Sequence, residues 1–104
     1  MTDREMLEFA AKAAGIGLKW HHSHNDAYAR RNGEYWAVWN PLANDGDALR
    51  LAVRCDIAFM LETERTSATT NTGQRFTEWL GTDPYAATRR AIVRAAAEIG
   101  RGME

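Results

Sequence analysis

Several residues of this 104-residue chain are of types that carry chemistry, and the densest group is a run of histidines. If the run is a strand, His22 and His24 share one face because side chains alternate along a strand, and Asp26 adds an oxygen ligand. Such a set can bind the metal ion of a hydrolase. A catalytic metal needs three placed ligands and an outer shell that orients them, which three clustered residues in a polar turn do not ensure. We therefore favour a solvated loop and predict no metal and no cofactor.

A second group is a basic ridge near the end of the chain. Arg90 and Arg94 stand four residues apart, with Arg89 beside them, so that a helix would bring their guanidinium groups together. Guanidinium groups bind phosphate or the carboxylates of a partner protein in a bidentate manner. The alternative is a solvated helix face in which Glu98 pairs with Arg94. We favour that alternative and keep the three arginines as candidate binding residues.

A third group consists of aromatic residues in the segment 34–39. Trp36 and Trp39 can stack on a nucleobase or anchor a protein partner. Packing in the core is the alternative, and we favour it for each single tryptophan because a small domain needs large side chains to fill its interior. On a strand these two side chains point to opposite faces, so one of them is a candidate for exposure.

Other motifs argue against catalysis. The single cysteine, Cys55, excludes an internal disulfide and a cysteine-rich zinc site, and we predict a buried, unreactive thiol. The sequence Asn-Asp-Gly-Asp at 44–47 lacks the later ligands of a calcium loop and is typical of helix capping. No glycine-rich phosphate loop or nucleophile elbow is present. These motifs favour a non-enzymatic protein, and the metal-dependent hydrolase stays open as an alternative.

Composition bounds the class of protein. With 104 residues, 45% of them hydrophobic and 26% charged, the chain is predicted to form a single domain over residues 1–104. A formal charge of −1 gives no overall positive field, so general nucleic-acid binding is not expected. The first residues lack the pattern of a signal peptide, and no stretch is apolar enough to cross a membrane. These features predict a cytoplasmic protein without membrane contact.

Three helices must position these residues. Apolar spacing predicts helices at 3–14 and 48–55. The last helix has Asp83 as its N-cap and Pro84 in its first turn, and we expect it to end at Gly100. The inward stripe predicted for the second helix consists of Leu49, Ala52 and Val53. The inward stripe predicted for the last helix consists of Tyr85, Thr88, Ile92, Ala95, Ala96 and Ile99.

Strands fill the intervals. We predict strands at 16–22 and 34–39 that pair across a polar loop at 23–32, and further strands at 56–63, 67–70 and 75–80. In the third of these five, Ile57, Phe59 and Leu61 alternate with other residues and should be buried on one face. The expected fold is α+β, with an antiparallel sheet of about four strands covered by about three helices in the order α-β-β-α-β-β-α.

Three segments, 2–15, 39–53 and 83–100, together resemble small uncharacterised proteins of tailed bacteriophages and prophages, the group called the phage ABA sandwich domain. The resemblance implies a phage or prophage origin, expression in the bacterial cytoplasm and an α+β sandwich. It implies no catalytic residue.

Small phage proteins of this kind often act on functions of the host. The leading hypothesis is therefore a non-enzymatic accessory protein that binds a host factor, either a component of an antiphage defence system or a small nucleotide signal, through the arginines and an exposed tryptophan. One alternative is a self-associating structural protein, a homodimer formed through an aromatic strand surface. The other is the metal-dependent hydrolase that uses His22, His24 and Asp26.

Overall fold

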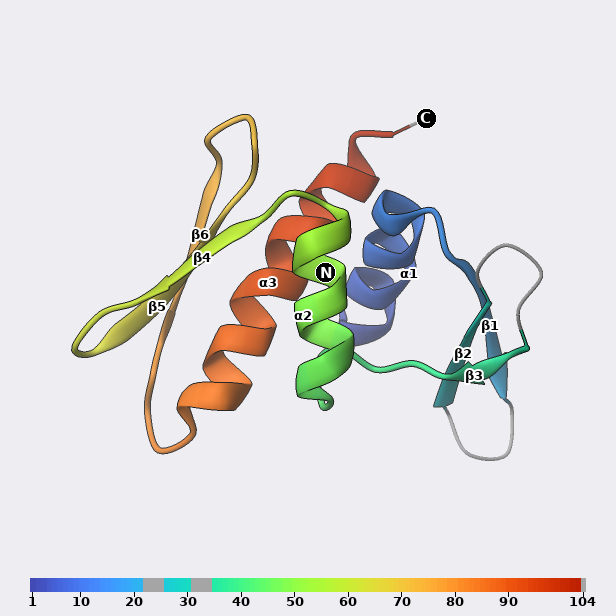
Figure 1. The fold of residues 1–104 in the computed structure, drawn as a ribbon, viewed down its shortest axis with the longest axis horizontal. Helices are drawn as coiled ribbons and strands as arrows, with labels where there is room; N and C mark the ends of the chain where they lie inside the picture. The colour runs from blue at the N-terminus through green and yellow to red at the C-terminus, as the bar shows by residue number, and fades with distance from the viewer. Residues whose placement is uncertain (22–25, 31–34, 104) are drawn as a thin grey trace.

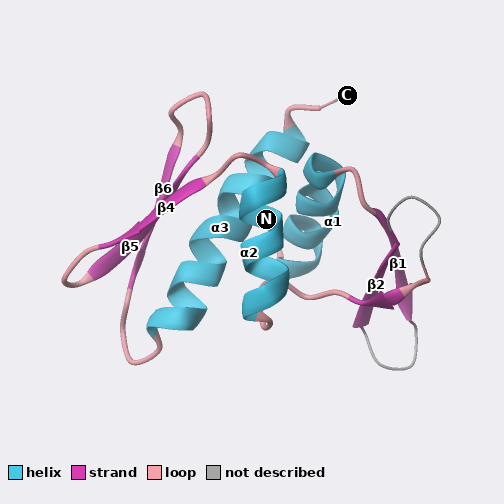
Figure 2. Cartoon of the chain, in the orientation of Figure 1, coloured by secondary structure: helices cyan, strands magenta, loops and turns pink. Residues whose placement is uncertain are grey.

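The fold consists of a central layer of helices between two small sheets (Figure 1). The computed structural model describes residues 1–21, 26–30 and 35–103. Its elements, in chain order, are α1 (Asp3–Ala14), β1 (Gly17–His21), β2 (Asp26–Arg30), β3 (Ala37–Val38), α2 (Asp45–Arg54), β4 (Ala58–Leu61), β5 (Arg65–Thr69), β6 (Arg75–Trp79) and α3 (Pro84–Arg101). The predicted α+β class is confirmed. The predicted single sheet of about four strands is wrong, because β1-β2-β3 and β4-β5-β6 form separate antiparallel sheets on opposite sides of the helices (Figure 2).

Helix α1 has the predicted bounds because both of its ends are capped. The Thr2 hydroxyl accepts a hydrogen bond from the Glu5 N–H at 3.1 Å, and the Glu5 carboxylate accepts one from the Thr2 N–H at 2.9 Å. Gly15 closes the helix in the left-handed region, with φ of 69°.

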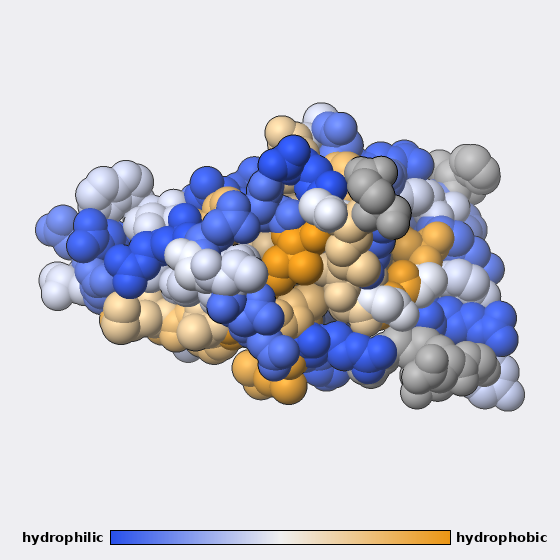
Figure 3. All heavy atoms as spheres, turned by 90° about the horizontal axis from the view of Figure 1, so that it is seen from above, coloured by the Kyte–Doolittle hydropathy of each residue, from blue (hydrophilic) through white to orange (hydrophobic). Residues whose placement is uncertain are grey.

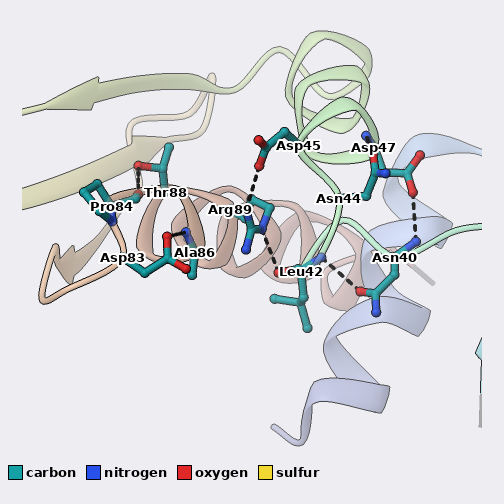
Figure 4. Close-up of polar contacts among 10 residues, drawn as sticks. All are labelled: Asn40, Leu42, Asn44, Asp45, Asp47, Asp83, Pro84, Ala86, Thr88 and Arg89. Carbon is teal, nitrogen blue, oxygen red and sulfur yellow. Dashed lines mark hydrogen bonds and ion pairs between the residues drawn. The ribbon is translucent and has the colours of Figure 1, made fainter.

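Helix α2 begins earlier than predicted. The Asn44 side chain accepts from the Asp47 N–H at 2.9 Å, so the segment read from the sequence as a capping loop already forms the first helical turn (Figure 4). The predicted inward stripe of α2 is also partly wrong. Ala48, Leu51 and Ala52 are buried, whereas Leu49 and Val53 are 53% and 71% exposed.

Helix α3 starts as predicted, with the Asp83 carboxylate accepting from the Ala86 N–H at 3.1 Å. Its predicted end is wrong, because the helix passes through Gly100 and stops at Arg101. Gly100 serves the packing of two helices instead. A Cβ atom at this position would lie 1.8 Å from the Phe9 carbonyl oxygen, so α1 and α3 approach each other more closely than any side chain permits.

The first sheet differs most from the prediction. The segment 23–32, predicted as a polar loop, contains strand β2, which pairs with β1 and places Ala27 opposite Trp20 and Ala29 opposite Leu18. The predicted strand at 34–39 shrinks to the two residues of β3, which pair with β2 rather than with β1. The small apolar residues of β2 alternate with polar ones, and this short alternation was masked by the polar composition around it.

The second sheet is built from two hairpins, β4–β5 and β5–β6. Helix α3 packs mainly over β5 and β6. The Thr88 hydroxyl of α3 lies 3.2 Å from the Thr66 hydroxyl of β5, and Thr66 and Ala68 are fully buried. Strand β4 is at the edge of the sheet, farther from the helix.

The core lies where the three helices meet. It is rich in alanine, which lets the helix axes come close, and larger side chains of α1 and α2 fill the remaining space. Its buried members on α1 and α3 include Met6, Leu7, Ala10, Ala14, Ala91, Ile92, Val93, Ala95 and Ala96. None of the helices in the described part of the chain is both long enough and apolar enough to span a membrane.

Candidate functional site

The three arginines of the predicted basic ridge lie on α3, but each one is held by a different segment of the chain. Arg89 is mostly buried, donates to the Leu42 carbonyl at 2.8 Å and pairs with Asp45 at 2.6 Å (Figure 4). Arg90 pairs with Asp3 at 3.1 Å. Each of these guanidinium groups therefore joins α3 to a neighbouring segment and has a carboxylate beside it.

Arg94 has a more specific position at the edge of the second sheet. Its guanidinium pairs with Glu78 at 2.6 Å, donates to the Thr77 carbonyl oxygen at 3.0 Å and lies over the ring of Phe76. In β6, Thr77 is one of the residues whose backbone groups point away from β5, as the pairing of Thr70 with Gln74 and the alternation along the strand require. Arg94 thus occupies one backbone acceptor at the outer edge of β6.

The two candidate tryptophans have different environments. Trp39 is 7% exposed and belongs to the core, whereas Trp36 is 36% exposed. Lys19 lies 4.5 Å from the centre of the Trp36 ring, and Arg30 lies 6.0 Å from it. Trp36 is beside the first sheet. The hollow that Trp39 lines contains neither Arg90 nor Arg94, and the two hollows that Arg90 lines contain neither candidate tryptophan.

The predicted metal site falls largely outside the described residues, which include neither His22 nor His24. Asp26 is exposed at the start of β2, where it lies opposite His21 of β1 in the strand register. Across residues 1–21, 26–30 and 35–103, no three histidine, cysteine or acidic side chains lie close enough together to hold a metal ion.

Cys55 follows the last residue of α2 and is half-buried. Burial raises the pKa of its thiol above the ordinary value of 9.0, because the thiolate would lose hydration, while the nearby Arg54 opposes this shift. The thiol is therefore protonated at neutral pH, and its nucleophilic form is scarce.

A surface that the sequence did not predict lies between α2, β4 and the first half of α3. It is a groove of about 570 Å³, lined mainly by apolar side chains, which we call the apolar groove. Four of its lining residues are large and exposed: Leu49 at 53%, Phe59 at 41%, Leu61 at 55% and Tyr85 at 69%. From above, apolar side chains are visible along the lower margin of the left half of the molecule, the half that holds β4–β6 (Figure 3).

All four of these residues were predicted from their spacing to point into the core, and that prediction is wrong. For Phe59 and Leu61 the physical reason is the position of α3, which covers β5 and β6 and leaves the same face of β4 open. Leu49 and Tyr85 border this open face from α2 and α3. The periodic signal was nevertheless informative, since it identified side chains of a type suited to burial. What sequence reasoning missed is that the chain itself does not bury them.

The free edge of β4 adds unpaired backbone groups to this surface. Glu62 donates its N–H to the Arg65 carbonyl at 2.8 Å. Because backbone groups that point toward β5 occur at every second residue, those of Met60 and Ala58 also bond to β5. The N–H and C=O groups of Phe59 and Leu61 consequently point to the outside of the sheet. An exposed, apolar edge strand of this kind is a template for another strand.

Comparison with known proteins adds no relative: no protein-family model, curated protein or solved structure matches this chain. The resemblance to phage ABA sandwich proteins therefore stays a prediction.

Proposed function

We propose that this chain is a non-enzymatic, self-associating protein that forms a homodimer by pairing β4 with β4 of a second copy. The observation that carries the proposal is the open edge of β4, where Phe59, Met60 and Leu61 are 41%, 49% and 55% exposed in succession. Antiparallel pairing would join two three-stranded sheets into one sheet of six strands, in which the β4 edge of each copy is no longer open.

The two edges of the second sheet differ in how accessible their backbone groups are, and this difference favours pairing through β4. At β6, Arg94 occupies the Thr77 carbonyl and hinders the addition of a strand. At β4, residues 57–61 carry no charge, and the charged residue that follows, Glu62, is paired with Arg65 at 2.8 Å. A second copy therefore meets no uncompensated like charge along the strand.

The free backbone groups also select one register. The backbone groups of Phe59 and Leu61 point outward, so Phe59 can form a hydrogen-bonded pair with Leu61 of a second copy, and Leu61 with its Phe59. This register places Met60 opposite Met60 on the two-fold axis. A shift toward the start of the strand would require Ile57, but its N–H already donates to Ala52 at 2.9 Å. A shift toward the end would require Thr63, which lies beyond the strand.

Burial of apolar surface supplies the driving force. In this register Phe59 and Leu61 of both copies lie on the face that carries the apolar groove, and the two Met60 side chains meet on the opposite face. Leu49 and Tyr85, which extend the groove from α2 and α3, supply further apolar contact for the added strand. Strands of four residues make a small interface, so we expect a dissociation constant in the micromolar range.

Sedimentation velocity over protein concentrations from about 1 µM to about 500 µM tests the proposal. The mass is expected to rise from that of the 11.7 kDa chain to twice that value as concentration increases. A mass of one chain over the whole range contradicts the proposal. The host factor and the phage origin predicted from the family resemblance are not needed for this association and stay predictions.

A further inference from the structure

A second hollow lies between the first sheet and α2 and is independent of the β4 edge. Its volume is about 240 Å³. Its apolar lining includes Ile16, Ala29, Trp39 and Leu51, and none of these residues lines the apolar groove. We call this hollow the arginine cavity because three arginines also line it.

The arginine cavity carries an excess of positive charge. Among the residues that the structure describes, Arg30, Arg50 and Arg54 line it together with one carboxylate, Asp47. Asp47 is already engaged, since it pairs with Arg50 at 2.8 Å and accepts from the Asn40 N–H at 3.0 Å. Within the described chain, neither Arg30 nor Arg54 has a carboxylate at ion-pair distance.

This charge pattern differs from that of the arginines on α3. Arg89, Arg90 and Arg94 each have an acidic partner, so their charge is neutralised locally. Among the described residues of the arginine cavity, three guanidinium groups share one carboxylate, and the concave shape directs their positive charge toward a common point. Arg54 is held in place by donating its Nε hydrogen to the Ala14 carbonyl at 3.0 Å, and its terminal nitrogens are not used by that bond.

Two aromatic residues also line the arginine cavity. Tyr35 lines the cavity and is 96% exposed, so its ring has almost no contact with the rest of the chain. Trp39, also in the lining, is buried, and its backbone N–H donates to the Ala27 carbonyl at 2.9 Å. The exposed Tyr35 ring is therefore available to a ligand in the cavity, which suits a ligand that has both a flat ring and an anionic group.

We propose that the arginine cavity binds a small aromatic phosphomonoester of about the size of a mononucleotide. The phosphate would accept hydrogen bonds from Arg30 and from the terminal nitrogens of Arg54, and the ring of the ligand would lie against Tyr35 and the apolar lining. The volume of about 240 Å³ lies below the range typical of sites for drug-sized ligands, about 300 to 1,000 Å³, which sets an upper limit on the ligand.

Titrations followed by backbone and indole NMR signals test this assignment, with adenosine 5′-monophosphate and uridine 5′-monophosphate as probes. At least one of the two is expected to shift the signals of Tyr35, Trp39 and Arg50. Adenosine, uridine and inorganic phosphate are each expected to bind at least about tenfold more weakly than that monophosphate, because the nucleosides lack the phosphate and inorganic phosphate lacks the ring. If neither monophosphate shifts these signals at millimolar concentration, or if inorganic phosphate binds equally well, the proposal is overturned.

Two variants separate a defined site from general attraction of anions. Arg30→Gln and Arg54→Gln are each expected to weaken binding of the monophosphate by about tenfold or more, since each removes a charge-assisted hydrogen bond. Arg75→Gln, an exposed arginine on β6, is the matched control and should leave the affinity unchanged. Equal weakening by all three variants overturns the proposal, and thermal melts confirm that the variants remain folded.

Discussion

Replacing Leu61 with lysine is expected to convert the proposed dimer into a monomer. In the register that the free edge selects, Leu61 pairs with Phe59 of the second copy, so Leu61→Lys places an ammonium group in an apolar seam, once in each copy. Removing charge from water without a partner is costly, and lysine on edge strands is a common barrier to strand addition. We expect sedimentation velocity to show association weakened at least about a hundredfold, equivalent to about 3 kcal/mol.

The folded monomer should tolerate this change. Leu61 is 55% exposed, and its backbone groups point away from β5, so lysine can extend into solvent without breaking a strand bond. The matched control is Trp79→Lys, which replaces an exposed apolar residue (72%) at the other edge of the same sheet. The control should dimerise like the original protein. Loss of the dimer in Trp79→Lys but not in Leu61→Lys would place the interface at β6 and refute the pairing through β4.

The largest expected effect on stability comes from Gly100→Ala. A Cβ atom at this position would overlap the Phe9 backbone, at 1.8 Å from its oxygen and 2.6 Å from its carbonyl carbon. Because both atoms belong to the backbone of α1, no side chain can move aside, and the two helices must separate. We expect the free energy of unfolding to fall by about 3 kcal/mol or more. The melting temperature should fall by roughly 10 to 25 °C, measured by circular dichroism.

Gly102→Ala is the matched control for this substitution. Gly102 lies just beyond α3 with φ of −79°, and an added Cβ atom would meet its nearest neighbour at 3.6 Å, an ordinary contact. Its melting temperature should stay within a few degrees of that of the original protein. Equal stability of the Gly100→Ala and Gly102→Ala proteins would show that α1 and α3 do not approach each other at Gly100.

Features that depend on local chemistry were predictable from the sequence. The start of α3 follows from a capping carboxylate at Asp83 and a proline that loses no hydrogen bond in the first turn, and both ends of α1 follow from Thr2 and Gly15. These signals lie within a few residues of the boundary that they determine. The predicted end of α3 at Gly100 was wrong because a glycine near the end of a helix resembles a stop signal. This glycine is instead required by close contact with the backbone of Phe9, which is remote in sequence.

Features that depend on how elements meet were not predictable. Spacing alone indicates that Phe59 and Leu61 share an apolar face, but only the position of α3 determines that this face stays open. The ion-pair partners of the arginines on α3 were likewise not predictable. Their spacing indicates a common ridge, whereas their partners, Asp45, Asp3 and Glu78, come from three separate parts of the chain.

The most direct measurement of the proposed pairing is disulfide formation by Met60→Cys. In the proposed register the two residues at position 60 face each other in a non-hydrogen-bonded pair, with Cα atoms about 4.5 Å apart, a separation that a disulfide spans. Two cysteines from Ala58→Cys would be displaced by four residues along the strand, roughly 13 Å apart, and should not join. Cys55, half-buried and with a raised thiol pKa, serves as the background in the original protein.

Under mild oxidation, non-reducing electrophoresis of the Met60→Cys protein is expected to show nearly complete conversion to a covalent dimer, while the Ala58→Cys and original proteins remain single chains. A Met60→Cys protein that stays uncrosslinked, or an Ala58→Cys protein that crosslinks as readily, would contradict antiparallel pairing of β4 centred on Met60.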